Sequence, residues 1–175
     1  MYGVAKCLPN LEYCWVVVGL LEDELMKILL ATISPRRSGL TGPAAALLEG
    51  YIERSGRYSS VEHRSFTSEE AVLEFLEQAA GRTRPALLLA DSRGKQFSSK
   101  EFAGELARLR DNGTQTLLLG IGPADGWSAA ALKRADLTLA FGRITLPHEL
   151  AAVVAAEQIY RALTILAGHP YHTGH

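Results

Sequence analysis

The chain has 175 residues, of which 47% are hydrophobic and 21% charged, a composition typical of one globular domain with enough apolar material for a core. Its formal net charge is −1, so bulk charge does not indicate a nucleic-acid partner, and polyanion binding would need a local basic patch. No apolar run is long enough for a membrane-spanning helix, and residues 26–175 contain no cysteine, which excludes a disulfide framework or a cysteine-based zinc site there.

The first 25 residues differ from the rest of the chain. They contain both cysteines, Cys7 and Cys14, and one lysine against four acidic residues. Their apolar stretch WVVVGLL (15–21) is followed by acidic residues rather than by a small-residue cleavage site, which disfavours a signal peptide. Met26 then opens a strand pattern, as a natural initiator methionine would. We therefore expect residues 1–25 to result from a start site placed too far upstream, or else to be a poorly ordered extension. We expect residues 26–175 to be a cytoplasmic domain.

Strand and helix patterns alternate from Met26 onward. Apolar runs predict strands at 27–33, 86–91 and 115–121, and weaker patterns predict strands at 60–66 and 135–141. Helical spacing predicts helices at 43–54, 67–76, 98–112 and 147–168, with a short one near 128. Two capping boxes, Thr67 with Glu70 and Ser98 with Glu101, would start the second and third of these helices. This alternation predicts an α/β fold with a mostly parallel sheet covered on both faces.

Ligands of parallel sheets bind beyond the carboxyl ends of the strands, so the loops after strands are the candidate sites. Three of them carry glycine: DSRGK (91–95), GIGPADG (120–126) and FGRITLP (141–147). The central loop is neither a dinucleotide fingerprint nor a P-loop, and by itself it is also consistent with a plain turn. Glycine at three neighbouring strand ends indicates one ligand held mainly by the backbone.

Other chemistry is weakly indicated. No serine lies in a nucleophile-elbow motif, and Asp91 and Asp125 fit turn formation as well as acid–base work. Glu157 falls on an apolar helix stripe and therefore needs a partner, for instance across a dimer. His148 lies at a helix start, where we interpret it as a structural cap.

The chain ends with HPYHTGH (169–175), which allows three interpretations: a metal site, a frayed tail, or a tail held in a functional pocket. A short terminal segment with Pro170 and Gly174 is poorly suited to the fixed geometry that zinc requires, so we predict no metal.

Three segments, ITLPHEL (144–150), AEQIYRA (156–162) and HPYH (169–172), follow the glycine-rich loop in that order. In this they resemble the family of large-subunit rRNA pseudouridine N3-methyltransferases (the RlmH family) of the SPOUT superfamily. The resemblance extends from Met26 to His172 and is most specific in the second half.

That resemblance implies a SPOUT fold with a C-terminal trefoil knot, a homodimer, and S-adenosyl-L-methionine bound by the three glycine-bearing loops. It places cofactor contacts at Ala90, Gly94, Gly120, Gly122, Gly126, Phe141, Gly142, Arg143, Ile144, Thr145 and Leu146. It also implies that the tail closes over the cofactor, which puts Tyr171 and His172 beside the transferable methyl group.

The implied reaction is methyl transfer to N3 of a pseudouridine in 23S rRNA within the ribosome, with no membrane or DNA partner. N3 must lose a proton, and His172 is the first candidate for that role. Arg161 would steady the rRNA phosphate or the tail, or would form an ordinary helix-surface ion pair. The alternatives are a SPOUT methyltransferase for another RNA and a non-catalytic RNA- or ribosome-binding module.

The chain also departs from the family pattern. Pro123 stands where the family usually has a second glycine, which removes one backbone donor, although IGP-x-x-G resembles another SPOUT branch. Thr173 and Ala152 stand where basic residues are common. For the dimer we expect an apolar stripe on the last helix formed by Leu150, Val153, Val154 and Ala162.

Overall fold

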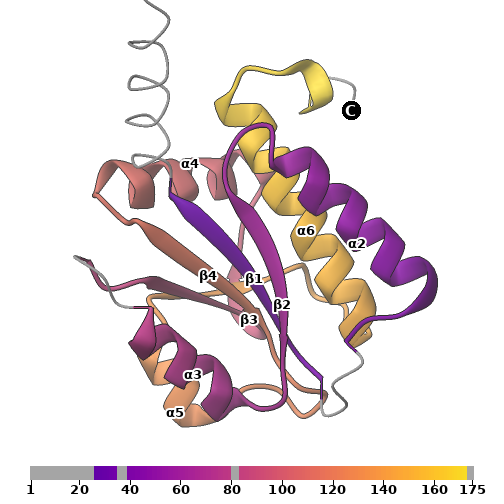
Figure 1. Ribbon diagram of the computed structural model, residues 1–175, viewed down its shortest axis with the longest axis vertical. Helices are drawn as coiled ribbons and strands as arrows, with labels where there is room; N and C mark the ends of the chain where they lie inside the picture. Colours follow the sequence, from indigo (N-terminus) through magenta and orange to yellow (C-terminus); the bar gives the residue numbers. More distant parts are fainter. Residues whose placement is uncertain (1–25, 35–38, 80–82, 173–175) are drawn as a thin grey trace, which may run out of the picture.

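The computed structural model describes residues 26–34, 39–79 and 83–172, which form three layers with a sheet in the middle (Figure 1). The sheet within these residues consists of β1 (Lys27–Ile33), β2 (Val61–Phe66), β3 (Ala86–Gln96), β4 (Thr116–Ile121) and β5 (Leu137–Ala140). The strand order is β2-β1-β4-β3-β5, and neighbouring strands are parallel throughout. The predicted α/β class and parallel sheet are therefore confirmed. The start-site extension with Cys7 and Cys14 lies outside the described residues.

Helices cover both faces of the sheet. They are α2 (Gly42–Ser55), α3 (Glu69–Gln78), α4 (Ser99–Asp111), α5 (Ala129–Arg134) and α6 (His148–Leu166), followed by the 3₁₀ turn η1 (Pro170–His172). Helices α2, α4 and α6 pack on one face, and α3 and α5 pack on the other. Among the described helices, none is both long enough and apolar enough to cross a membrane.

Two hydrophobic cores, one on each face, explain the continuous apolar runs. Leu30 of β1 belongs to the core under α2, α4 and α6, whereas its neighbour Leu29 belongs to the core under α3 and α5. Both side chains are almost fully buried. Because successive strand residues point to opposite faces, a strand covered on both sides must be apolar at nearly every position. Each such leucine stabilises the fold by roughly 1.5–3 kcal/mol through burial.

The helix starts confirm one predicted capping box and correct the other. Ser98 Oγ accepts a hydrogen bond from the Glu101 amide, and the Glu101 carboxylate accepts one from the Ser98 amide, as predicted. At α3 the cap is Ser68, whose Oγ accepts from the Ala71 amide at 3.3 Å, and not Thr67. Adjacent threonine and serine are both good caps, so the sequence did not distinguish them.

Strand β3 is longer than predicted, because the segment expected as the first loop, residues 91–95, continues the strand to Gln96. It pairs with β5 on both sides of an irregularity between Ala90 and Lys95. A Cβ on Gly94 would lie 2.6 Å from the backbone N and C of Leu139, which is closer than any real side chain approaches. Gly94 therefore lets two backbones pass in close contact, and this pairing extends the strand through polar residues.

Candidate functional site

A cavity of about 190 Å³ lies where β4 and β5 end, beside the middle of β3. Three separate segments form its walls: residues 90–92, the loop after β4, and the loop between β5 and α6. The site predicted from strand ends is thus a real concavity. Eight of the eleven residues predicted to bind a cofactor line it: Ala90, Gly122, Gly126, Phe141, Gly142, Ile144, Thr145 and Leu146.

Backbone makes up much of this wall. Gly126 and Gly142 have positive φ angles, 81° and 121°, and no atom lies within 4 Å of the place where a Cβ would stand. These two glycines are therefore required by the path of the backbone and not by crowding. Pro123 also lines the cavity and lacks the amide proton that another residue would offer there.

Three residues predicted to bind a cofactor do not line the cavity. Gly94 faces Leu139, as described above, and Arg143 is exposed in the β5–α6 loop. Gly120 is enclosed by side chains, since a Cβ there would lie 2.8 Å from Leu89 and 2.8 Å from Trp127. Gly94 and Gly120 thus do not line the cavity, and instead allow close packing against Leu139 and Trp127.

Trp127 is a supporting residue that the sequence analysis missed. It is buried, and its indole Nε1 donates a hydrogen bond to the carbonyl oxygen of Ala90 at 3.1 Å. The same ring lies against Gly122, where a Cβ would come within 2.9 Å of Nε1. Trp127 therefore joins two walls of the cavity. A tryptophan directly after a glycine-rich turn was the available signal.

His148 does not cap α6, which corrects the structural interpretation given above. The N-cap position is Pro147, without a side-chain hydrogen bond, and His148 instead places Nδ1 2.9 Å from the carbonyl oxygen of Gly122. Since a carbonyl oxygen can only accept, Nδ1 carries the proton. Nε2 is then buried without a partner among the described residues. This imidazole lines the cavity and links two of its walls.

Asp91 is held in its ionised form at the edge of the cavity. Its carboxylate accepts hydrogen bonds from the backbone amide of Arg93, at 2.9 Å, and from the Arg93 guanidinium, at 3.0 and 3.1 Å. These hydrogen bonds lower the pKa of Asp91 below its ordinary value. Asp91 and Arg93 therefore form an ion pair at the edge of the cavity at neutral pH.

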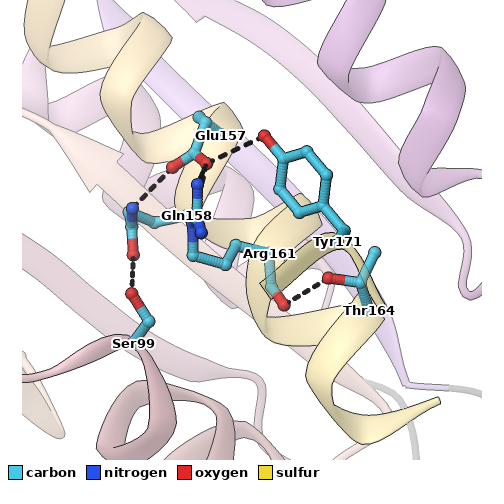
Figure 2. Close-up of polar contacts among 6 residues, drawn as sticks. All are labelled: Ser99, Glu157, Gln158, Arg161, Thr164 and Tyr171. Carbon is cyan, nitrogen blue, oxygen red and sulfur yellow. Dashed lines mark hydrogen bonds and ion pairs between the residues drawn. The ribbon is translucent and has the colours of Figure 1, made fainter. Parts of the chain in front are cut away.

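Two of the predicted catalytic residues, Arg161 and Tyr171, meet on the middle of α6 at the Glu157 carboxylate (Figure 2). Glu157 Oε1 accepts a hydrogen bond from Arg161 Nε at 2.8 Å and another from the Tyr171 hydroxyl at 3.2 Å. The Arg161 guanidinium also lies over the Tyr171 ring, 4.8 Å from its centre. Burial, followed by the Glu157 charge, raises the pKa of Tyr171 to about 12. Tyr171 is therefore a neutral phenol that donates a hydrogen bond.

This cluster is separate from the cavity within one chain, and no described tail residue lines the cavity. Along α6, Glu157 lies about 14 Å beyond His148. The Tyr171 ring packs on Tyr160, with centroids 4.7 Å apart, and His169 packs on Tyr58, just before β2. The tail thus lies toward the amino ends of the strands, and it does not close over the cavity of its own chain (Figure 1).

His172 shares this turn with Tyr171 and is half-buried, and its Nδ1 is buried without a partner in the described part of the chain. The remaining tail residues, Thr173 to His175, lie outside the described residues. Within residues 26–34, 39–79 and 83–172, no three His, Cys, Asp or Glu side chains gather closely enough to hold a metal ion.

Comparison with known proteins shows which family this chain resembles in sequence. A family model described as "Predicted SPOUT methyltransferase" matches residues 26–172. A protein of Koribacter versatilis named "Ribosomal RNA large subunit methyltransferase H" is 52% identical over 125 residues, which cover 71% of this chain and 85% of the relative. A protein of the same name from Methylocella silvestris is 40% identical and covers 84% of this chain and 99% of the relative.

Two solved structures share the fold at low sequence identity. The tRNA (m1G37) methyltransferase of Aquifex aeolicus has a TM-score of 0.54 at 14% identity, covering 78% of this chain and 69% of its own. A probable methyltransferase of Bordetella pertussis has a TM-score of 0.51 at 15% identity, covering 83% and 99%. Together with the match over residues 26–172, the cavity at the strand ends shows that this chain belongs to the SPOUT methyltransferase family.

Proposed function

We propose that this protein transfers a methyl group from S-adenosyl-L-methionine to N3 of a pseudouridine in 23S rRNA on the ribosome, in the cytoplasm. The observation that carries the proposal is the cavity at the ends of β4 and β5, lined by eight of the residues that the family resemblance assigned to the cofactor. The relatives that are 40% and 52% identical to this chain over the aligned residues are named for methylation of large-subunit rRNA.

The cavity fits this cofactor chemically. Ile121, Leu139 and Phe141 offer an apolar surface for an adenine ring, and the glycine-bearing loops bring backbone to the cavity wall. S-adenosylmethionine supplies a methyl group on a positively charged sulfur, and the bonding electron pair stays with sulfur when the methyl group leaves.

The protein must manage the proton on N3 of the target base. The new N3–C bond needs the nitrogen lone pair, so the N3 proton has to pass to a base. We assign this role to His172, which is half-buried and whose Nδ1 forms no hydrogen bond in the described structure. The neutral Tyr171 hydroxyl, held by Glu157, keeps the turn that carries His172 in place.

The separation of tail and cavity within one chain points to a homodimer in which the tail of one protomer serves the cavity of its partner. Leu150 is 50% exposed on α6, and Val153 and Val154 are half-buried. These three residues form an outward apolar face that a second copy would cover. Ala162, predicted to belong to the same stripe, is 1% exposed and lies in the core, so it does not belong to this face.

Binding of rRNA would depend on local basic groups and on the shape of the assembled ribosome, because the net charge is −1. Lys95 and Arg143 are exposed next to the cavity walls, and a dimer doubles their number. We further propose that the segment from β5 into α6 threads the trefoil knot implied by the family, and that neither DNA nor a membrane is a partner.

The test is methylation of ribosomal subunits that lack the modification, with radiolabelled S-adenosylmethionine, followed by mass mapping of the modified nucleotide. We expect label at one pseudouridine of the large subunit. Label on tRNA or on the small subunit would instead identify a SPOUT enzyme for another RNA. If calorimetry detects no binding of S-adenosylmethionine, the protein is a non-catalytic RNA-binding module.

A further inference from the structure

A second and larger cavity, of about 330 Å³, adjoins the first one. The two share four lining residues, 139–142, so ligands in the two cavities would lie next to each other along that segment. The aromatic side chains in the second cavity are Phe97, Phe102 and Phe141. The proposed function, which binds the cofactor in the first cavity and uses the tail for the proton, leaves this second cavity unassigned.

Gln158 and Ser99 place a polar pair in the wall of this cavity (Figure 2). The Ser99 hydroxyl lies 3.1 Å from Gln158 Oε1, and Gln158 Nε2 donates a hydrogen bond to Glu157 Oε2 at 2.5 Å. Because a carboxylate accepts only, Glu157 determines which end of the amide is the nitrogen. Glu157 is itself held by Arg161 and Tyr171, so the amide of Gln158 has a defined orientation.

An amide held in this way still has unused hydrogen-bonding capacity. Nε2 carries two protons, of which Glu157 takes one, and Oε1 has two lone pairs, of which Ser99 takes one. One donor and one acceptor therefore remain side by side on Gln158. That pair matches a ring edge that presents an N–H next to a C=O.

We propose that the second cavity binds the target base and that Gln158 reads the N1–H and C2=O edge of a pseudouridine. This proposal rests on the proposed function and adds the residue that determines specificity. In uridine, N1 is bonded to the ribose and has no proton, so the acceptor Oε1 of Gln158 finds no donor there. N3 lies on the other side of C2=O and stays free to receive the methyl group.

The aromatic side chains and a nearby cation fit a base that has left its stack. A base taken out of RNA is usually held between aromatic or apolar side chains, and Phe97, Phe102 and Phe141 provide such surfaces. Lys95 is exposed at this edge, with Nζ 4.6 Å from the centre of the Phe97 ring, close enough to meet the phosphate of a flipped nucleotide. The cavity thus offers stacking, edge recognition and charge together.

The test compares Gln158→Met with the parent protein on large subunits that carry either pseudouridine or uridine at the target position. Met has a similar length but neither donates nor accepts as an amide does. We expect the parent to prefer pseudouridine in kcat/KM by about tenfold or more, the range of one bidentate contact. In Gln158→Met that preference should fall toward one, because the pseudouridine rate loses two contacts and therefore falls by a larger factor than the uridine rate, which loses only the contact to C2=O.

Three further variants make the result decisive. Ser99→Ala, which removes the partner of Gln158 Oε1, should reduce the preference for pseudouridine by a smaller factor than Gln158→Met does. Gln158→Asn, whose amide is one methylene shorter, should reduce it by a larger factor than Ser99→Ala does. These two also replace Gln158→Met if its melting temperature shows that it does not fold. Gln78→Met on α3 is the matched control and should keep the parental preference, because Gln78 contacts Glu74 on the exposed side of that helix.

The other outcomes overturn the proposal in distinguishable ways. An unchanged preference in Gln158→Met, or a parent that does not distinguish the two bases, shows that Gln158 does not read the N1 edge. A weaker affinity of Gln158→Met for S-adenosylmethionine assigns the second cavity to the cofactor. A parent that binds the cofactor but methylates neither substrate refutes the proposed function, and the base-reading role falls with it.

Discussion

Nδ1 of His148 lies 2.9 Å from the carbonyl oxygen of Gly122 and thereby joins the first turn of α6 to the loop after β4. Both residues line the candidate cofactor cavity, and the tail follows the opposite end of the same helix. One hydrogen bond thus holds the helix that carries the tail against the loop that forms the cavity.

Replacing His148 with alanine should weaken cofactor binding by about five- to tenfold, because one hydrogen bond to a wall of the site is worth about 1 kcal/mol. Calorimetry with S-adenosylmethionine measures the effect. His63→Ala is the control, since His63 contacts Thr32 from the edge strand β2, far from the cavity, and should leave the affinity unchanged. Parental affinity in His148→Ala would mean that this link does not support the site.

The phenol of Tyr171 should titrate unusually late, since its pKa is raised to about 12 by burial and by the Glu157 charge. A pKa that is higher in the folded state than in the unfolded state adds stability below the unfolded value of about 10, and this stability is lost as the pH rises toward 12. Ultraviolet titration should show one late tyrosine that disappears in Tyr171→Phe and persists in Tyr58→Phe. A spectrum without that step would contradict the Glu157 contact.

If tail and cavity come from different protomers, two inactive variants should restore each other. Gly142→Val should block the cavity, because its φ of 121° disfavours a branched side chain, and His172→Ala should remove the proton acceptor. Coexpressed, they should regain about a quarter of the parental methyl transfer, since half of the dimers are mixed and each contains one intact site. Each variant alone should lose about a hundredfold or more. Failure of the mixture to recover would exclude a shared site.

Gly94→Ala should destabilise the fold by about 1–3 kcal/mol, because its Cβ would meet the Leu139 backbone at 2.6 Å. Gly104→Ala is a matched control in α4, where a Cβ meets nothing within 4 Å. That change should stabilise the helix by about 0.5–1 kcal/mol. Thermal unfolding of the two variants should therefore shift in opposite directions, and equal shifts would show that the β3–β5 crossing tolerates a side chain.

A chain that starts at Met26 should keep its melting temperature and its cofactor affinity. The family match begins at this residue, its side chain is buried, and its carbonyl oxygen accepts a hydrogen bond from Ser59 Oγ at 2.8 Å. The measurement is thermal unfolding with and without S-adenosylmethionine. A large drop in melting temperature would assign a structural role to residues 1–25.

The sequence predicted the layers and the place of the cavity well, for a physical reason. Strands buried on both faces need continuous apolar runs, such as LLLA around Leu88 and TLLLGI around Leu118. Parallel strands end on one side, so glycine-bearing turns after them had to lie together. These features depend on short stretches of chain.

The remaining features depend on contacts between distant segments. Gly94 and Gly122 look alike in the sequence, but the first packs against a neighbouring strand, whereas the second lines the cavity and packs against Trp127. The extension of β3 depends on pairing with β5, and the place of Tyr171 depends on Glu157 and Tyr160. None of these partners can be identified from local pattern, so the sequence could not show on which residues of its own chain the tail rests.

The strand order has a consequence for how the chain acquires its structure. β4 lies between β1 and β3, and it pairs with both, although both precede it in the sequence. A growing chain that has not yet reached Thr116 holds the β1–β2 pair and β3 as separate pieces, with their apolar edges open. The single sheet can therefore form only after Thr116–Ile121 has been synthesised. Pairing β4 with β1 closes a long stretch of chain, and such long-range pairing makes folding slow.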